Sequence, residues 1–525
     1  MIKTDIILPK DYTGEDVKDK VITKLPIKRE EIKEIRIVKR ALNIDESGIF
    51  YKTTVAIALS KDREEGLLKM RKKVSPYSFE IFSPKPLTLK KSPIVVGSGP
   101  AGLFAALILA EAGANPIVLE RGEDVEARGK TVEKFMKYGI LNTESNVQFG
   151  EGGAGTYSDG KLKTGTMDKY KMKVLTEFVN AGADGEILYS TSAHLGTDRL
   201  SGIVKKIREK IISLGGNFIF SARLFDIKFD TGRVSSVLYE KNGETVELPC
   251  DNLILAIGHS ARDSFEMLYS HGFIMEPKGF GIGVRIEHPR EYINSLVYGK
   301  HNRDDLESAS YHLVTHLPTG RSVYSFCMCP GGVVVPAASE EGGIVTNGMS
   351  VYRRNADNSN AALLVSLTPR DFGTDHPLAG FDLQRKIEAS AYNKTSSYRA
   401  PSVSLVSFLD GKEAESASVT PSYAIGTNTL SPDKYLPDYV SESLREAMPD
   451  FDKWMPGFNY PDATLTGPET RSTSPVRIQR GEGYEAIGKG GVFPIGEGAG
   501  YSGGIVSSAV DGVRGAEALL NKYSH

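Results

Sequence analysis

The chain has 525 residues, enough for about three or four domain-sized units, each with its own core. Its 64 Lys and Arg nearly balance its 66 Asp and Glu, so no overall field favours nucleic acid or an anionic membrane. The start of the chain lacks a basic-then-apolar signal, and no charge-free run of about 20 apolar residues occurs, which predicts a cytoplasmic protein. With 3 cysteines and no His and Cys spacing typical of zinc sites, we expect neither a disulfide framework nor a metal site.

Residues 1–90 are predicted to form a small N-terminal α+β module. Apolar runs alternate with helical patterns in the order strand, helix, strand, strand, helix, strand, which favours a ferredoxin-like layout. A proline-rich, basic linker at 83–92 ends the module. The expected strands are Asp5–Leu8, Ile35–Leu42, Phe50–Leu59 and Val74–Phe82, and the second helix is Arg63–Lys73.

A nucleotide-binding βαβ unit follows at 94–121, IVVGSGPAGLFAALILAEAGANPIVLER. Gly97 permits a tight turn out of the first strand, Gly99 lets backbone amides approach a pyrophosphate, and Gly102 lets the helix pack closely on the sheet. Pro100 and Ala101 begin that helix, whose N-terminus faces the phosphates. Glu120 ends the second strand, about 20 residues beyond the turn, where a carboxylate can accept hydrogen bonds from a ribose. The unit predicts a bound dinucleotide.

The βαβ domain is interrupted and resumes later in the chain. A helix over Asp198–Leu214 precedes an apolar strand at Asn252–Ile257 that ends in Gly258, as expected of a buried parallel strand beside a cofactor. A strand runs into the glycine-rich turn at 490–500, and a helix follows over Ile505–Leu520. We therefore assign 91–274 and 481–525 to one domain and 275–480, with interrupted strands and few helices, to a substrate or cap domain. Between the helix at Asp198–Leu214 and the apolar strand at Asn252–Ile257 lie short strands, at Asn217–Ser221, Leu224–Phe229, Val234–Glu240 and Thr245–Pro249.

The order of these elements favours FAD over NAD, because only one glycine triplet follows a convincing strand. A first βαβ unit, a meander, an apolar strand and a C-terminal strand with an acidic turn together build a single FAD domain in two-domain flavoproteins. Gly496 and Glu497 stand in the acidic turn, where the carboxylate would lie near the ribityl and pyrophosphate. The amides of Gly503, Gly504 and Ile505 could stabilise negative charge at the flavin N1 and O2 edge. The predicted fold is α/β, a Rossmann-like doubly wound FAD domain with a mixed α+β second domain and the N-terminal module.

Several longer segments resemble the uncharacterised FAD-dependent dehydrogenases of bacteria, within a wider group of glutathione-reductase-like and geranylgeranyl-reductase-like flavoproteins. The resemblance covers the chain from about Ile94 to its end and implies FAD as cofactor, without implying a substrate. The segments that carry it are NVQFGEGGAGTYSDGKL (146–162), AIGHSAR (256–262), FCMCPGGVVVPAASE (326–340), NGMSVYRRNADNSNAALLV (347–365), GPETRSTSPVRIQR (467–480) and GEGAGYSGGIVSSAVDG (496–512).

The resemblance also implies roles for individual residues. It places the loop with Gly152, Gly153, Ala154 and Gly155 beside the isoalloxazine ring. Arg121 and Arg128 would contact the adenosine or pyrophosphate, since guanidinium groups suit phosphate, and Leu224 would offer its backbone to the adenine. A solvated helix face remains the alternative for both arginines.

No catalytic residue stands out in the sequence, and four weak candidates remain. Lys161 could stabilise the anionic reduced flavin, although solvated surface lysines are commoner. His259 lies in the cofactor turn as a candidate acid or a simple cap. Cys327 and Cys329 would point the same way in a strand, but such close pairs make strained disulfides, so small buried residues are the default reading and a redox dithiol the alternative.

The function predicted from the sequence is an FAD-dependent oxidoreductase that exchanges hydride between flavin N5 and an unidentified small molecule. Without a second glycine triplet, NAD(P)H could act only as a transient reductant, or another protein could supply the electrons. Arg471, Arg477 and Arg480 could bind an anionic substrate or lie in a surface loop. There are two alternatives: a carbon double-bond reductase, or a flavin-containing regulatory protein that binds a partner through the N-terminal module. We do not expect nucleic acid as a ligand, because the basic patch at 28–40 also holds acidic residues.

Overall fold

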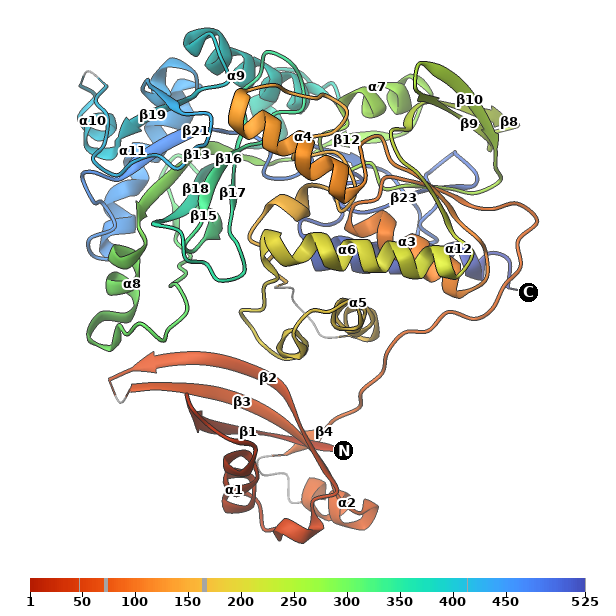
Figure 1. Ribbon diagram of the computed structural model, residues 1–525, viewed down its shortest axis with the longest axis vertical. Helices are drawn as coiled ribbons and strands as arrows, with labels where there is room; N and C mark the ends of the chain where they lie inside the picture. Colours follow the sequence, from red (N-terminus) through yellow and green to blue (C-terminus); the bar gives the residue numbers. More distant parts are fainter. Residues whose placement is uncertain (47, 70–73, 163–167, 413, 525) are drawn as a thin grey trace.

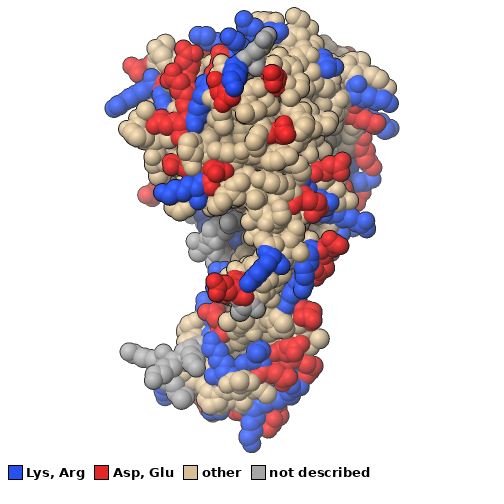
Figure 2. Space-filling view, turned by 90° about the vertical axis from the view of Figure 1, so that its left-hand side faces the viewer, with Lys and Arg blue, Asp and Glu red and all other residues tan. Residues whose placement is uncertain are grey.

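A computed structural model describes residues 1–46, 48–69, 74–162, 168–412 and 414–524. It shows three regions in chain order, with the N-terminal module below the body of the molecule and joined to it by an extended connection (Figure 1). The face in Figure 2 carries acidic and basic side chains intermixed over both parts, with a narrow waist between them. No helix in the described ranges combines the length and apolar character that a membrane crossing requires.

The N-terminal module is a four-stranded sheet in the order β2-β3-β1-β4, in which each neighbouring pair is antiparallel. Thr13 and Asp16 form a capping box that starts the first helix. The last strand spans only two residues, so the strand expected at Val74–Phe82 is largely wrong; the part of the predicted helix at 70–73 lies outside the described residues. The elements are β1 (Ile2–Pro9), α1 (Gly14–Lys24), β2 (Glu34–Asp45), β3 (Gly48–Ala58), α2 (Lys61–Lys69) and β4 (Ser75–Pro76).

The module contacts the body through Lys10, which pairs with Asp305, and through Arg40. Its backbone forms an isolated parallel bridge with Ser190, and its guanidinium lies 5.1 Å from the ring centroid of Tyr189 and 4.7 Å from that of Tyr51. An ion pair of 2.6 Å to Glu186 completes the contact.

The second region is a doubly wound domain around a five-stranded parallel sheet of order β23-β11-β5-β6-β7, which confirms the predicted fold class. The predicted βαβ unit and the returning C-terminal strand lie in this one sheet. Its elements are β5 (Ile94–Val96), α3 (Pro100–Glu111), β6 (Ile117–Leu119), α4 (Val125–Tyr138), α5 (Lys169–Asn180), α6 (Gly196–Ser213), β7 (Asn217–Ile219), β8 (Arg223–Asp230), β9 (Arg233–Lys241), β10 (Glu244–Pro249), β11 (Leu253–Leu255), α7 (Arg262–Ser270), β23 (Val492–Pro494) and α12 (Ile505–Asn521).

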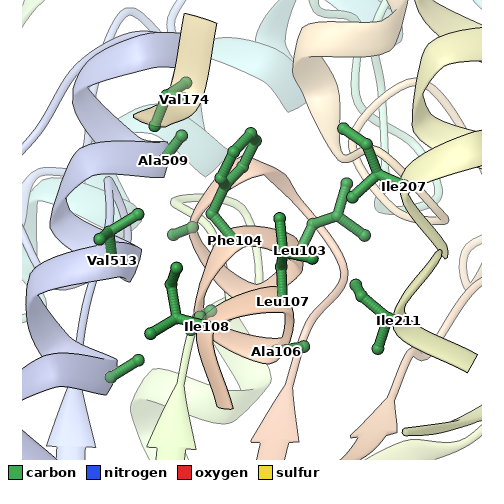
Figure 3. Packing of buried hydrophobic residues seen from close by; sticks show 14 of the residues in the cluster. Leu103, Phe104, Ala106, Leu107, Ile108, Val174, Ile207, Ile211, Ala509 and Val513 are labelled. Atoms are coloured by element: carbon green, nitrogen blue, oxygen red, sulfur yellow. The ribbon is translucent and has the colours of Figure 1, made fainter. Parts of the chain in front are cut away.

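Two cores cover the two faces of this sheet, because side chains alternate along each strand. Val95 faces a cluster with α3, α5, α6 and α12, whereas Ile94 and Val96 face the meander β8–β10. Helix α3 is apolar all round and lies between α12 and α6, with Phe104 and Leu107 fully buried (Figure 3). Burial on every side explains why this helix lacks a polar face.

The third region holds a seven-stranded sheet of order β14-β15-β18-β13-β21-β19-β20. Helix α11 packs on β13, β14 and β18, and α9 packs on β19 and β21. These two helices have 17 residues each, so the expectation of few helices was wrong here. The elements are β12 (Met275–Pro277), β13 (Gly281–Pro289), α8 (Arg290–Tyr298), β14 (Val314–His316), β15 (Ser322–Cys329), β16 (Val333–Pro336), β17 (Thr346–Met349), β18 (Asn358–Ser366), α9 (Ala379–Thr395), β19 (Ala400–Ser404), α10 (Leu405–Asp410), β20 (Thr427–Thr429), α11 (Asp438–Trp454), β21 (Thr464–Glu469) and β22 (Val476–Ile478).

Candidate active site

The glycine turn after β5 is shaped by close backbone contacts. Gly97 has φ +95°, and a Cβ there would lie 2.3 Å from the carbonyl oxygen of Ala256. A Cβ on Gly102 would lie 1.9 Å from the carbonyl oxygen of Gly97, so only glycine lets α3 approach the turn this closely. Gly99, the N-cap of α3, is different: the nearest atom to its Cβ would be the Cα of Gly153, at 3.7 Å. Two glycine-rich loops therefore meet here, backbone against backbone.

A cavity of about 420 Å³ runs between the doubly wound domain and the seven-stranded sheet. Most of the candidates from the sequence line it, including all four catalytic ones. These are Gly97, Gly99, Pro100, Ala101, Glu120, Arg121, Gly153, Ala154, Gly155, Lys161, Leu224, Gly258, His259, Cys327, Cys329, Gly496, Glu497, Gly503, Gly504 and Ile505.

Three candidates lie behind the cavity wall: Gly102, Gly152 and Arg128. The Arg128 side chain is fully buried and donates to the carbonyl oxygens of Asn146 at 2.9 Å, Val147 at 3.0 Å and Glu151 at 2.6 Å. These bonds anchor the loop that leads into the glycine-rich segment. The structure thus gives Arg128 a different role from the predicted phosphate contact, because its donors are used on the backbone.

The cavity fits a dinucleotide because two helices point their N-termini at it. Helix α3 begins at Gly99 and α12 at Gly504, and neither has a side-chain cap. Uncapped first-turn amides carry partial positive charge and favour anionic groups such as a pyrophosphate or a reduced flavin edge. The residues that would hold FAD are therefore present, with backbone donors at both ends and little side-chain obstruction between them.

Glu120 lines the cavity, but its carboxylate already has four protein donors. One oxygen accepts from the amide and hydroxyl of Ser98, at 2.8 and 2.7 Å. The other accepts from the amides of Gly122 at 2.9 Å and Gly150 at 3.0 Å. Because a carboxylate offers about four acceptor positions, a ribose hydroxyl can bind Glu120 only if the Ser98 hydroxyl turns away.

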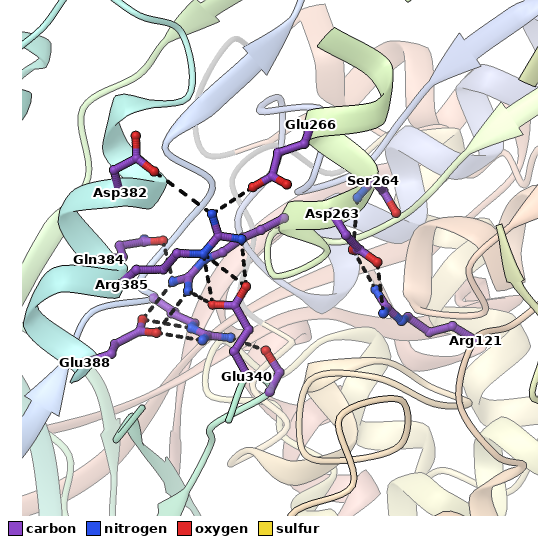
Figure 4. Close-up of polar contacts among 12 residues, drawn as sticks. Arg121, Asp263, Ser264, Glu266, Glu340, Asp382, Gln384, Arg385 and Glu388 are labelled. Atoms are coloured by element: carbon purple, nitrogen blue, oxygen red, sulfur yellow. Dashed lines mark hydrogen bonds and ion pairs between the residues drawn. The ribbon is translucent and has the colours of Figure 1, made fainter. Parts of the chain in front are cut away.

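Arg121 also lines the cavity and is held by two carboxylates, of Glu144 and Asp263, each at 3.0 Å. Figure 4 shows the contact with Asp263. Its guanidinium lies 4.1 Å from the ring centroid of Phe149. The pairing holds the pKa of Asp263 below its usual value, although burial acts in the opposite direction. With its charge compensated, Arg121 offers a flat surface rather than a free cation for the predicted phosphate contact.

The other end of the cavity is formed by the glycine-rich loop and the seven-stranded sheet. The ammonium of Lys161, directly after the loop, donates to the carbonyl oxygen of Met328 in β15. Nδ1 of His259 lies 3.8 Å from a carboxylate oxygen of Glu497, and its Nε2 is buried without a hydrogen-bond partner among the described residues. Gly155 touches Ile505 at the start of α12, since a Cβ on Gly155 would lie 3.0 Å from Cγ1 of Ile505. We call this part of the cavity the redox end.

The two cysteines of β15 do not share a face, contrary to the expectation from strand alternation. β15 pairs with β18 at Phe326↔Ala362 and next at Cys329↔Asn360, a shift of one residue, and Cys327 has φ +38°. Both residues border the cavity, but with this β-bulge only Cys327 is exposed there, whereas Cys329 is 1% exposed. Both thiols are free, and Sγ of Cys329 donates to the carbonyl oxygen of Cys327 at 3.2 Å.

The charged residues from the seven-stranded region that line the cavity are paired, and sequence reasoning missed these pairs. Arg285, fully buried, binds Glu469 through two nitrogens, at 2.5 and 2.9 Å. Arg471 binds Glu388 at 2.8 Å and donates to Ser339. Because the partners are 83 to 184 residues apart, no local pattern could reveal them.

Two of the three arginines at 471–480, which could bind an anionic substrate, are engaged by carboxylates. Arg471 is paired as described, and Arg480 is paired with Asp511 at 2.7 Å. Arg477 lies with its guanidinium 5.2 Å from the ring centroid of Tyr501. Within the described ranges, no group of three or more His, Cys, Asp or Glu residues could hold a metal ion.

Comparison with known proteins identifies the family. Residues 91–267 match the family model described as pyridine nucleotide-disulphide oxidoreductase, and residues 279–472 match the model described as FAD-dependent protein, C-terminal domain-like. A protein of Clostridium beijerinckii described as uncharacterized is 46% identical over 517 residues, which cover 96% of this chain and 95% of that protein. The chain belongs to the FAD-dependent oxidoreductases. FAD is its cofactor.

Three solved structures match this FAD-dependent oxidoreductase at low identity and with TM-scores below 0.4. Quinol fumarate reductase FrdA of E. coli is 12% identical, with 83% of this chain and 71% of that chain covered and a TM-score of 0.39. The 3-ketosteroid-Δ4-(5α)-dehydrogenase of Rhodococcus jostii is 14% identical, with 84% and 99% covered and a TM-score of 0.36. A geranylgeranyl bacteriochlorophyll reductase-like protein of Thermoplasma acidophilum is 10% identical, with 83% and 80% covered and a TM-score of 0.36.

Proposed function

We propose that the protein exchanges a hydride between N5 of its FAD and an uncharged small molecule that binds at the redox end of the cavity. One observation carries the proposal: a single cavity is walled by both the nucleotide loops and the seven-stranded region. FAD supplies the redox chemistry when bound, and the chain supplies position, electrostatics and exclusion of water.

The pairing of charges supports an uncharged substrate. Glu469 and Arg471, which line the cavity, are each neutralised by a buried partner. Breaking such a pair to bind an ionic substrate would leave a buried charge uncompensated. Asn347 offers a polar contact instead: its amide oxygen accepts from Arg285 at 3.1 Å and from the Gly348 amide at 2.8 Å, which leaves its NH₂ group as the end for a ligand.

Anaerobic stopped-flow absorbance of the holoprotein with NADH and NADPH tests the proposal. We expect a yellow protein whose flavin band bleaches with one of the two nucleotides, acting as a transient reductant. Bleaching by dithionite but by neither nucleotide would assign electron supply to the substrate or to a protein partner. A colourless preparation that cannot be reconstituted with FAD would contradict the proposal.

Lys161→Met is expected to make the flavin reduction potential more negative, because Lys161 is a cation at the redox end and an anionic reduced flavin gains from it. A change of roughly 30 mV corresponds to about 1.4 kcal/mol for a two-electron couple. Dye-equilibration titration of the flavin measures it. Lys169→Met is the control, since Lys169 is exposed and does not line the cavity; an unchanged potential in the Lys161 variant would remove the role.

A further inference from the structure

Cys327 occupies an unusual place in the cavity wall. It is exposed to the cavity, whereas Cys250 and Cys329 are buried. Its strand touches the glycine-rich loop, because the Lys161 ammonium bonds the carbonyl oxygen of the next residue, Met328. The thiol therefore stands at the redox end, where the loop assigned to the isoalloxazine ring meets the seven-stranded sheet.

The backbone at Cys327 is built to hold this position. The positive φ is uncommon for a residue with a side chain and persists only where surrounding contacts fix it. The carbonyl oxygen of Cys327 accepts from Arg285 at 3.1 Å and from the Cys329 thiol at 3.2 Å. Fixed in this way, the bulge leaves the Cys327 thiol exposed at the cavity wall and the Cys329 thiol buried behind it.

We propose that Cys327 is an acid of the active site: its neutral thiol gives a proton to the substrate atom next to the one that receives the hydride. This inference rests on the proposed function. The substrate class is an uncharged molecule with a polarised carbon–carbon double bond, and a nicotinamide supplies the electrons. Hydride from N5 forms one C–H bond, the Sγ–H bond breaks as its proton forms the other, and the double bond becomes single while the flavin is oxidised. The thiolate regains its proton from water.

The protonation of Cys327 agrees with a donor role. Although the thiol borders the cavity, desolvation by the surrounding protein raises its pKa to about 12, and Glu469 and the Cys329 thiol act in the same direction. Arg285 and Lys161 act against this rise without cancelling it. The thiol is therefore protonated at neutral pH, which suits an acid and disfavours a thiolate nucleophile or a redox dithiol.

A spectroscopic titration tests the placement and protonation of Cys327 without a known substrate. Oxidised holoprotein is taken from about pH 7 to about pH 11 as wild type, Cys327→Ser and Cys329→Ser, following ultraviolet thiolate absorbance and long-wavelength thiolate-to-flavin charge transfer. We expect both signals to rise together only near the top of the range, in the wild type and Cys329→Ser but not in Cys327→Ser. Ionisation near neutral pH, or ionisation of Cys327 without charge transfer, would overturn the proposal.

A single-turnover measurement tests the proton transfer itself. Reduced holoprotein is mixed anaerobically with 2-cyclohexen-1-one, and flavin reoxidation is followed as a function of pH. Cys327→Ala should slow reoxidation by about 100-fold and Cys250→Ala, which removes a buried thiol outside the cavity wall, by less than about twofold, with the flavin potential unchanged in both. Equal rates in the two variants, or no reoxidation of the wild type, would overturn the inference. Failure of the proposed function can be distinguished from failure of this inference. Even if the flavin never exchanges electrons with a substrate, the charge-transfer absorbance in the titration still shows whether the Cys327 thiolate lies beside it.

Discussion

Gly99→Ala is expected to weaken FAD binding strongly while leaving the polypeptide folded. Gly99 has φ −67° and ψ −179°, which any residue adopts, and its new methyl group would meet only the Cα of Gly153, at 3.7 Å. The chain therefore accommodates alanine. The methyl group would stand at the uncapped N-terminus of α3, where the pyrophosphate must approach the backbone amides. We expect affinity to fall at least about 100-fold, or about 2.8 kcal/mol, by fluorescence titration of the apoprotein.

Gly102→Ala provides the contrast for this prediction. Its methyl group would lie 1.9 Å from the carbonyl oxygen of Gly97 and 3.0 Å from the carbonyl carbon, so backbone must move. We expect a lower melting temperature even without FAD, whereas apo Gly99→Ala melts like the apo wild type. Normal FAD content in Gly99→Ala would show that the phosphates do not lie at this helix end.

Glu388→Ala is expected to cause the largest loss of stability, about 3–5 kcal/mol. The carboxylate is 2% exposed and binds both Arg262 and Arg471, each through two nitrogens, at 2.8 to 3.0 Å (Figure 4). These contacts join α7, α9 and the segment after β21. Without Glu388, two buried guanidinium groups share only the partly exposed Glu340 as a counter-ion.

Arg385→Ala is the matched control, because Arg385 belongs to the same network but its side chain is 36% exposed. Its loss should cost less than about 1 kcal/mol. Thermal melts of both variants with FAD bound measure the difference. Equal shifts in melting temperature would contradict the idea that burial determines how much the ion pairs of Glu388 stabilise the fold.

The effect of Glu388→Ala should depend on pH in a definite direction. Arg262 and Arg471 hold the pKa of Glu388 far below its usual range, against the effect of burial. A carboxylate with a depressed folded pKa stabilises fully above its unfolded pKa of about 4.3 and loses this contribution as pH falls toward the folded value. The difference in melting temperature between wild type and variant should therefore be constant near neutral pH and shrink in acid; a difference that grows in acid would contradict the assignment.

Helices α9 and α11 show why the helices of the third region were not predicted from the sequence. The buried face of α9 includes Gln384 and Glu388, and that of α11 includes Ser441 and Ser443. Polar residues on an inward face blur the apolar periodicity from which helices are predicted. Pro449 inside α11 adds a local signal against a helix. In α9, Gln384 and Glu388 find their partners only after distant segments have packed.

The sequence by itself determined the nucleotide-binding unit, because its features are local, and the order of the later segments together with their family resemblance predicted the doubly wound fold and FAD. The turn at Gly97, the start of α3 and the acid at Glu120 lie within 28 residues, and their spacing follows from backbone geometry alone. The tertiary structure alone decided which charges are compensated and which thiol faces the cavity. Arg285 pairs with Glu469, which lies 184 residues away in the sequence. The β-bulge in β15, with its one extra residue, changes how the Cys327 and Cys329 side chains are placed. Strand register fixes such contacts, and a shift of one residue turns side chains to the other face, so they depend on the packed sheet rather than on any local pattern.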